Sequence, residues 1–234
     1  MRFIRAAFGM MLLLTAALPA LCQDLVAVAP QAAKVEYEDV RVRVVRLHLA
    51  PHASLPMHDR PARVVIPLTP NDVRTTRPDG TTSTVRSAAG NAAWSEPTRR
   101  SVANLDLPLD NVVVELKTVS TPGRPLAHPP TPSPAGYLDE RFHRWLFENQ
   151  YVRVYDVRIP PGVTTDFHDH AFDTVFVQIS GGLTAAQTPG QEWEAETAVP
   201  GSVEFRADVK HPRRHRVRND GTAEYHVIAV QLLQ

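Results

Sequence analysis

The stretch GVTTDFHDHAFDTVFVQISG, from Gly162 to Gly181, decides the fold. It holds two histidines, His168 and His170, one residue apart, followed by a run that alternates like a strand. Alternate residues of a β-strand share one face, so both imidazoles are expected on the same side of a sheet. Two imidazoles on one strand can chelate a metal ion if a third ligand arrives from another strand.

Short alternating runs recur along the chain, while helical patterns are scarce. These runs are rich in valine and isoleucine and are separated by glycine, proline and aspartate; examples are VRVRVVRLHL, RVVIPL, NVVVELK, YVRVYDVRI, TVFVQI and YHVIAVQLL. This pattern predicts an all-β protein made mostly of antiparallel strands.

The chain contains two similar halves. When the first half is shifted by 110 positions it aligns with the second without a gap, from Tyr37 against Phe147 onward. The identical pairs include His58/His168 and Val65/Val175. Two copies indicate duplicated domains, because a solenoid needs three or more repeats.

The segment between the halves is rich in proline. Residues 120–136 contain six prolines, which lack a donor and cannot pair in the middle of a sheet. An extended linker is therefore expected here. The sequence YLDERFHRWLFENQ that follows predicts one short helix, with Leu138, Phe142 and Leu146 on one side.

The N-terminus has the features of a cleaved secretory signal peptide over residues 1–22. Arg2 and Arg5 precede an apolar run from Ala6 to Leu18, and small residues lead to Cys22. The run is shorter than the ~20 residues that span a bilayer. We expect a periplasmic or secreted protein that has no membrane partner after cleavage.

The charge of the chain excludes one class of partner. Lysine and arginine number 25, aspartate and glutamate also 25, and the single cysteine lies in the leader. A near-neutral chain is not an obvious nucleic-acid binder, so a small-molecule ligand is expected instead.

A third ligand is available near the end of the chain. The sequence KHPRRHRVRNDG offers His211 and His215, and a chain reversal after either would bring an imidazole opposite the pair. Both histidines remain candidates on this ground.

At these residues the sequence resembles the cupin superfamily, and specifically its duplicated form, the bicupins. Gly162, His168, His170 and Gly181 match the spacing of the first cupin motif, and Thr174 stands at the motif's glutamate. His215 and Asn219 match the His-x3-Asn ending of the second motif, which favours His215 over His211. The second motif lacks its proline and inner glycine.

The resemblance implies a fold and a division into domains. Two cupin-like jelly-roll barrels are expected in tandem, over residues 34–118 and 147–234, with the linker and short helix at 119–146 between them. Proteins of the cupin superfamily often pair through strand edges, so the resemblance also implies a homodimer as a state to test.

The resemblance also implies one divalent metal ion in the second barrel, on His168, His170 and His215. Such a ligand set suits Fe, Mn, Ni, Cu or Zn. With no glutamate, the charge of the ion is left uncompensated, which favours an anionic ligand. Thr174 is expected to face the substrate, and Asp173, by alternation, to face away. A second acid or base is not evident near the histidines.

The first half is a degenerate copy. Arg60 stands where His170 does, and Arg100 stands where His215 does. Arginine stays protonated and cannot replace a neutral imidazole, so no metal is expected in this barrel. Either this half is structural, or Arg60 and Arg100 hold a carboxylate or phosphate.

Three functions therefore remain open. The chain is a metal-dependent enzyme of dioxygenase or isomerase type acting on a small organic acid, a non-catalytic binding protein, or a structural bicupin whose histidines are relics.

Overall fold

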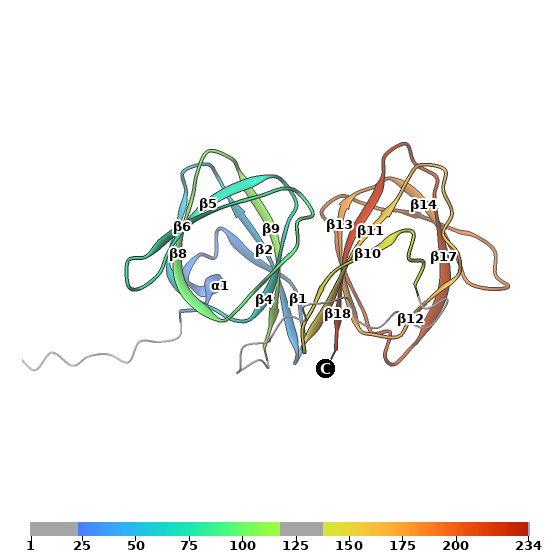
Figure 1. Ribbon diagram of the computed structural model, residues 1–234, viewed down its shortest axis with the longest axis horizontal. Coiled ribbons are helices and arrows are strands. Elements are labelled where there is room, and N and C mark those ends of the chain that lie inside the picture. The colour runs from blue at the N-terminus through green and yellow to red at the C-terminus, as the bar shows by residue number, and fades with distance from the viewer. Residues whose placement is uncertain (1–22, 118–137, 234) are drawn as a thin grey trace, which may run out of the picture.

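The computed structural model describes residues 23–117 and 138–233, and this part of the chain is almost entirely β (Figure 1). It forms two barrels side by side, as the alternating runs predict. The predicted signal peptide and the proline-rich segment at 120–136 lie outside the described residues. In the part that is described, no helix has the length and apolar character needed to cross a membrane.

The first half contains one short helix and nine strands. They are α1 (Leu25–Val28), β1 (Ala33–Glu38), β2 (Val42–Leu49), β3 (Ser54–Arg60), β4 (Arg63–Pro67), β5 (Asn71–Thr76), β6 (Thr82–Ser87), β7 (Ala93–Ser95), β8 (Thr98–Asn104) and β9 (Leu109–Leu116). A five-stranded sheet in the order β1-β2-β9-β4-β7 faces a four-stranded sheet in the order β3-β8-β5-β6.

The second half repeats this arrangement strand for strand. Its strands are β10 (His143–Glu148), β11 (Val152–Ile159), β12 (His168–His170), β13 (Thr174–Ser180), β14 (Leu183–Gln187), β15 (Glu194–Thr197), β16 (Val203–Arg206), β17 (Arg213–Asn219) and β18 (Tyr225–Leu232). Its sheets are β10-β11-β18-β13-β16 and β12-β17-β14-β15. The match of both orders confirms the duplication.

The ungapped alignment of the two halves is wrong by one residue from β4 onward. Val64 pairs with Val114 on the last strand of the first barrel, whereas Val175 pairs with Val230 on the last strand of the second. Because β2 and β11 meet these last strands in the same register, Val64 and not Val65 is the equivalent of Val175. The equivalent of Thr174 is therefore Arg63.

The short helix predicted after the linker is also wrong. Residues 143–148 form β10, which pairs with β11 in an antiparallel hairpin and belongs to the second barrel. A shift between Trp145 and Phe147 interrupts the register, as one between Val35 and Tyr37 does in β1. The spacing of Leu138, Phe142 and Leu146 looked helical, but only Leu146 lies on the strand.

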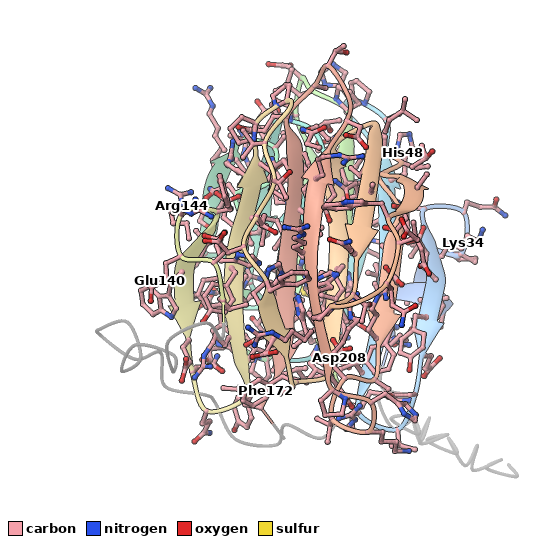
Figure 2. All side chains as sticks on the ribbon, turned by 90° about the vertical axis from the view of Figure 1, so that its right-hand side faces the viewer. Lys34, His48, Glu140, Arg144, Phe172 and Asp208 are labelled. Carbon is pink, nitrogen blue, oxygen red and sulfur yellow. The ribbon has the colours of Figure 1, made fainter. Side chains whose placement is uncertain are left out.

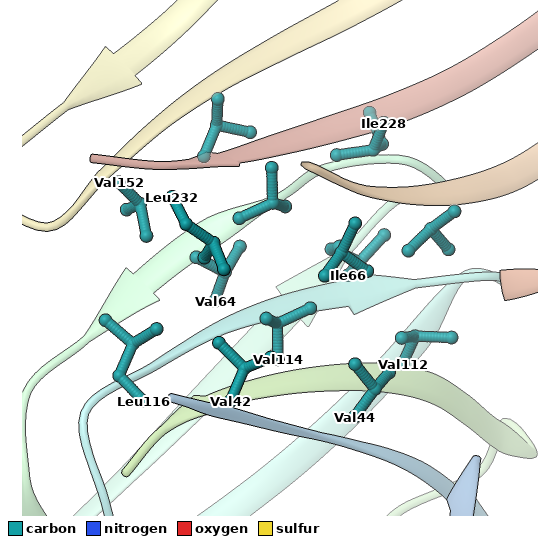
Figure 3. Packing of buried hydrophobic residues seen from close by; sticks show 14 of the residues in the cluster. Val42, Val44, Val64, Ile66, Val112, Val114, Leu116, Val152, Ile228 and Leu232 are labelled. Carbon is teal, nitrogen blue, oxygen red and sulfur yellow. The ribbon is translucent and has the colours of Figure 1, made fainter. Parts of the chain in front are cut away.

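The largest apolar cluster lies between the two barrels. The two five-stranded sheets turn their outer faces toward each other, and side chains from both interdigitate (Figures 1 and 3). Val42, Val114 and Leu116 come from the first barrel, and Ile228 and Leu232 from the second. Each fully buried aliphatic side chain contributes about 1.5–3 kcal/mol, so this layer joins the barrels strongly.

Aromatic and charged contacts frame the apolar layer. Tyr37 stacks on Phe205 with ring centroids 4.4 Å apart, and Trp94 stacks on Tyr151 at 6.0 Å. Arg41 of the first barrel donates to the Asp173 carboxylate of the second at 2.5 Å. Asp173 therefore faces the other barrel, as simple alternation predicts.

One glycine lets the barrels approach closely. Gly90 has φ +73°, and a Cβ atom there would lie 2.4 Å from Cε1 of His226 in the second barrel. His226 is buried, and its Nε2 lies 2.8 Å from Asp156, so the ring has little room to move.

We predict that Gly90→Ala lowers the free energy of unfolding by about 3 kcal/mol, through backbone strain and overpacking together. Gly80→Ala is the matched control, because Gly80 has φ +82° with nothing within 4 Å of its added Cβ. It should cost about 1 kcal/mol. Urea unfolding of residues 23–234 measures both, and equal losses would contradict the close approach.

A buried carboxylate makes stability depend on pH. Burial acts to raise the pKa of Asp156, but hydrogen bonds from His226 and Arg144 outweigh it and lower the pKa to about 2. Arg144 reaches this carboxylate from the edge of the second barrel (Figure 2). Because the folded pKa lies below the unfolded value, the ionised carboxylate stabilises the fold above pH 4, and this contribution is lost as the pH falls toward 2.

We predict that Asp156→Asn costs about 2 kcal/mol at pH 7 and that the difference from wild type shrinks between pH 4 and pH 2. Asp106→Asn, at an exposed aspartate, is the control and should leave the pH profile unchanged. Denaturant unfolding at several pH values tests this, and a difference independent of pH would contradict it.

Candidate metal centre

Three buried histidines meet inside the second barrel. His168 and His170 lie on β12, and His215 lies on β17 as the direct cross-strand partner of His168. One ring nitrogen of each lies within 4.8 Å of those of the other two. The three ring centroids are 4.8–5.1 Å apart. The residues predicted to be ligands are therefore brought together.

The ring nitrogens are placed as a metal ion would require. The Nδ1 of His168 lies 2.9 Å from the Asp166 carbonyl oxygen, so Nδ1–H donates there and Nε2 keeps its lone pair. The Nε2 atoms of His170 and His215 are 3.1 Å apart. Two nitrogens bound to one ion at ~2.1 Å and at about a right angle are ~3 Å apart. The geometry therefore fits a shared ion.

All three imidazoles are held in the neutral form that binds metal ions. Burial is the main cause that lowers their pKa values, and the positive charge of Arg213 adds to it for His170 and His215. The pKa of His215 falls to about 2. Neutral nitrogen donors therefore face the cavity at physiological pH.

The histidines line a cavity of about 100 Å³ inside the barrel. Arg206, Arg213, Glu196, Glu204 and Tyr225 also line it. The expectation that no second acid or base lies near the histidines is therefore wrong. Sequence reasoning missed Glu196, Glu204, Arg206 and Tyr225 because β15, β16 and β18 reach the cavity only through long-range pairing. Arg213 lies two residues before His215 on β17, so alternation could have placed it on the same face.

Comparisons of the sequence with family models and with curated proteins found no match. Comparison with solved structures found many similar folds at low identity. The Cupin 2 conserved barrel domain protein from Leptotrichia buccalis is 9% identical with a TM-score of 0.51, covering 86% of this chain and 88% of its own. The chain has the bicupin fold.

Two further bicupin structures in the comparison are oxalate decarboxylases. The Lactobacillus farciminis enzyme, solved as a formate complex, is 15% identical with a TM-score of 0.55, covering 85% of this chain and 80% of its own. The Bacillus subtilis enzyme, described with Mn(II) centres, is 12% identical with a TM-score of 0.54. The match covers 82% of this chain and 68% of the enzyme. At such identities the likeness establishes the fold alone.

The structure adds a fourth imidazole that was not predicted. His143 on β10 lines the cavity, and its ring centroid is 4.8 Å from that of His168. Its Nδ1 lies 2.9 Å from the Asp139 carbonyl, and burial, with the nearby His168, lowers its pKa to about 4. The repeat alignment, extended four residues back to place His143 against Ala33, could have shown it as part of a strand.

The remaining predicted or rival residues of the second barrel lie apart from the cluster. Thr174 is not among the described residues that line the cavity, and its hydroxyl donates to the Phe172 carbonyl at 2.7 Å. The substrate-facing role expected for it therefore has no support in the geometry. His211 is exposed in the turn before β17, and Asp166 is exposed and paired with Arg141.

Arg60 and Arg100 lie on β3 and β8 of the first barrel, whereas this cavity lies in the second barrel. They occupy the positions of His170 and His215, since His58 pairs with Arg100 as His168 pairs with His215. They therefore cannot contact a ligand of the three-histidine cluster.

We predict about one divalent metal ion per chain in residues 23–234, purified without a metal-affinity tag. His170→Ala and His215→Ala should each lose it, because each removes one donor of the cluster. His211→Ala is the matched control and should keep it. Elemental analysis after incubation with Mn, Fe, Ni or Zn measures the content. Retention in His215→Ala with loss in His211→Ala would contradict the assignment.

Proposed function

We propose that this bicupin is an exported metalloenzyme that acts on a small organic acid in its second barrel. One observation carries the proposal: three buried, neutral imidazoles converge in a cavity that two arginines, Arg206 and Arg213, also line. A metal ion on neutral ligands keeps its full charge, so the site favours an anionic substrate. The volume of about 100 Å³ favours a molecule of few atoms.

His168, His170 and His215 would hold a divalent ion such as Fe, Mn, Ni or Zn. The nitrogen donors, the 3.1 Å separation of two Nε2 atoms and the blocked Nδ1 of His168 all fit such an ion. When bound, the ion would supply Lewis-acid polarisation of a carboxylate or carbonyl oxygen, or redox chemistry if it is iron or manganese.

Arg213 is the side chain best suited to hold the substrate carboxylate. Its Nε is buried without a hydrogen-bond partner among the described residues and forms only a long ion pair with Asp208, at 3.6 Å. Arg206, in contrast, is already paired with Glu204 at 2.6 Å. A bound carboxylate would supply the hydrogen-bond acceptor that the Arg213 guanidinium lacks at Nε.

Glu204 and Tyr225 supply groups for proton transfer. Both line the cavity with Glu196, and burial and these two carboxylates raise the pKa of Tyr225 to about 12. Tyr225 therefore remains a hydroxyl donor at neutral pH, while a carboxylate beside it can accept or return a proton.

Two further observations support the proposal. Oxalate decarboxylase, the name carried by two structures of the same fold, denotes an enzyme of a small organic acid, and one of them has Mn(II) centres. The residues before Gln23 have the pattern of a secretory leader, which supports export to the periplasm or medium.

We predict that Arg213→Gln lowers kcat/KM for the accepted acid at least tenfold, mainly through KM, because it removes a charge-assisted hydrogen bond worth about 1.5–3 kcal/mol. Arg214→Gln is the matched control, because Arg214 lies next to Arg213 on β17 but faces outward and donates to Asp169 at 2.8 Å. Metal-loaded protein is assayed against C2–C6 carboxylic acids, with and without oxygen, by mass spectrometry.

The outcomes separate the alternatives. Turnover that depends on metal and on Arg213 supports the enzyme. Metal and acid binding without turnover would replace it with a non-catalytic binding protein. Absence of metal binding after reconstitution would overturn the proposal in favour of a structural bicupin.

A further inference from the structure

The first barrel carries arginines where the second carries its metal-site residues. Strand pairing places His58 at the position of His168, Arg60 at that of His170 and Arg100 at that of His215. The one-residue step at β4 places Arg63 at the position of Thr174, where the cupin motif has glutamate. Three of the four positions are therefore cationic.

Several nitrogen atoms of this arginine cluster, His58, Arg60, Arg63 and Arg100, are buried without partners. His58 and Arg63 are each 1% exposed. Among the described residues, no acceptor reaches Nε of Arg63 or Nε of Arg100. The two terminal nitrogens of Arg63 donate to the Pro61 carbonyl and the Ser95 hydroxyl, each at 2.7 Å. The Nδ1–H of His58 donates to the Pro56 carbonyl at 2.8 Å, so its Nε2 carries a lone pair and is not a donor. Unpaired buried donors are costly, so a missing acceptor is implied.

The positive charge of the arginine cluster is not balanced inside the barrel. Glu115 is the acid next to it, but Arg43 already binds that carboxylate through Nε at 2.7 Å. Burial and the charges of Arg60 and Arg100 lower the pKa of the Arg63 guanidinium, and burial with Arg77 lowers that of Arg100. Three positive charges therefore gather around one carboxylate that already binds a fourth arginine.

We propose that Arg60, Arg63 and Arg100 form a binding site for a small oxyanion, such as phosphate, sulfate or a short dicarboxylate. Guanidinium groups present paired N–H donors that match the oxygens of these anions. The paired strands β3 and β8 supply Arg60 and Arg100, and β4 of the facing sheet supplies Arg63. The same charges exclude a metal cation.

This proposal is independent of metal binding in the second barrel. Phosphate, sulfate and oxalate are each titrated into the metal-loaded chain of residues 23–234 at constant ionic strength, by calorimetry and by thermal unfolding. We expect at least one anion to bind and to raise Tm. Arg60→Gln and Arg100→Gln should weaken this binding at least tenfold, while Arg99→Gln should not. Arg99 neighbours Arg100 on β8 but pairs with Asp59 at 2.9 Å on the other face of the strand.

Two further readouts separate this site from its alternatives. Arg213→Gln should leave phosphate binding unchanged, whereas binding in the second barrel would be reduced. In buffer without polyvalent anions, Arg60→Gln should have a Tm equal to or above that of wild type, because it relieves repulsion. A variant with a lower Tm and unchanged anion affinity would overturn the proposal, as would the absence of binding for all three anions.

Discussion

The packing of one sheet against another between the barrels is the constraint on which the structure depends. Val42, Val114 and Leu116 on one side meet Ile228 and Leu232 on the other, so the strands that bear them are buried on both faces. Their inner faces must then line the barrel interiors. The site residues on these sheets, such as Arg63 and Tyr225, are therefore held by strands that cannot shift without disturbing the layer.

The two interiors differ in chemistry although their frames are the same. In the second barrel, imidazoles at three positions create a neutral site with lone pairs facing inward. In the first barrel, arginines at the equivalent positions create donors without acceptors. One scaffold thus carries side chains of opposite character, which we propose favour a cation in one barrel and an anion in the other, and the difference lies at a few inward-facing positions.

The sequence predicted local geometry better than long-range geometry. His168 and His170 share a strand face because of their spacing, and the repeat led to two barrels. His143 was missed because its place in the cavity depends on the β10–β11 hairpin, in a segment whose spacing looked helical. Arg63 was missed because a one-residue step before β4 moves it into the position of Thr174. Glu204 was missed because nothing local shows which way the short strand β16 faces.

The outward-facing ion pairs next to the two sites have a consequence for how the barrels diverged. Asp59 pairs with Arg99 in the first barrel, and Asp169 with Arg214 in the second, at the same place in the strand ladder. These pairs stayed the same while the residues beside them, one position along each strand, changed from imidazole to guanidinium or the reverse. Because a pleated strand separates its two sides, one side can keep an inherited contact while the other acquires a new specificity. Gene duplication on such a scaffold lets each copy be respecialised without rebuilding the wall that supports it.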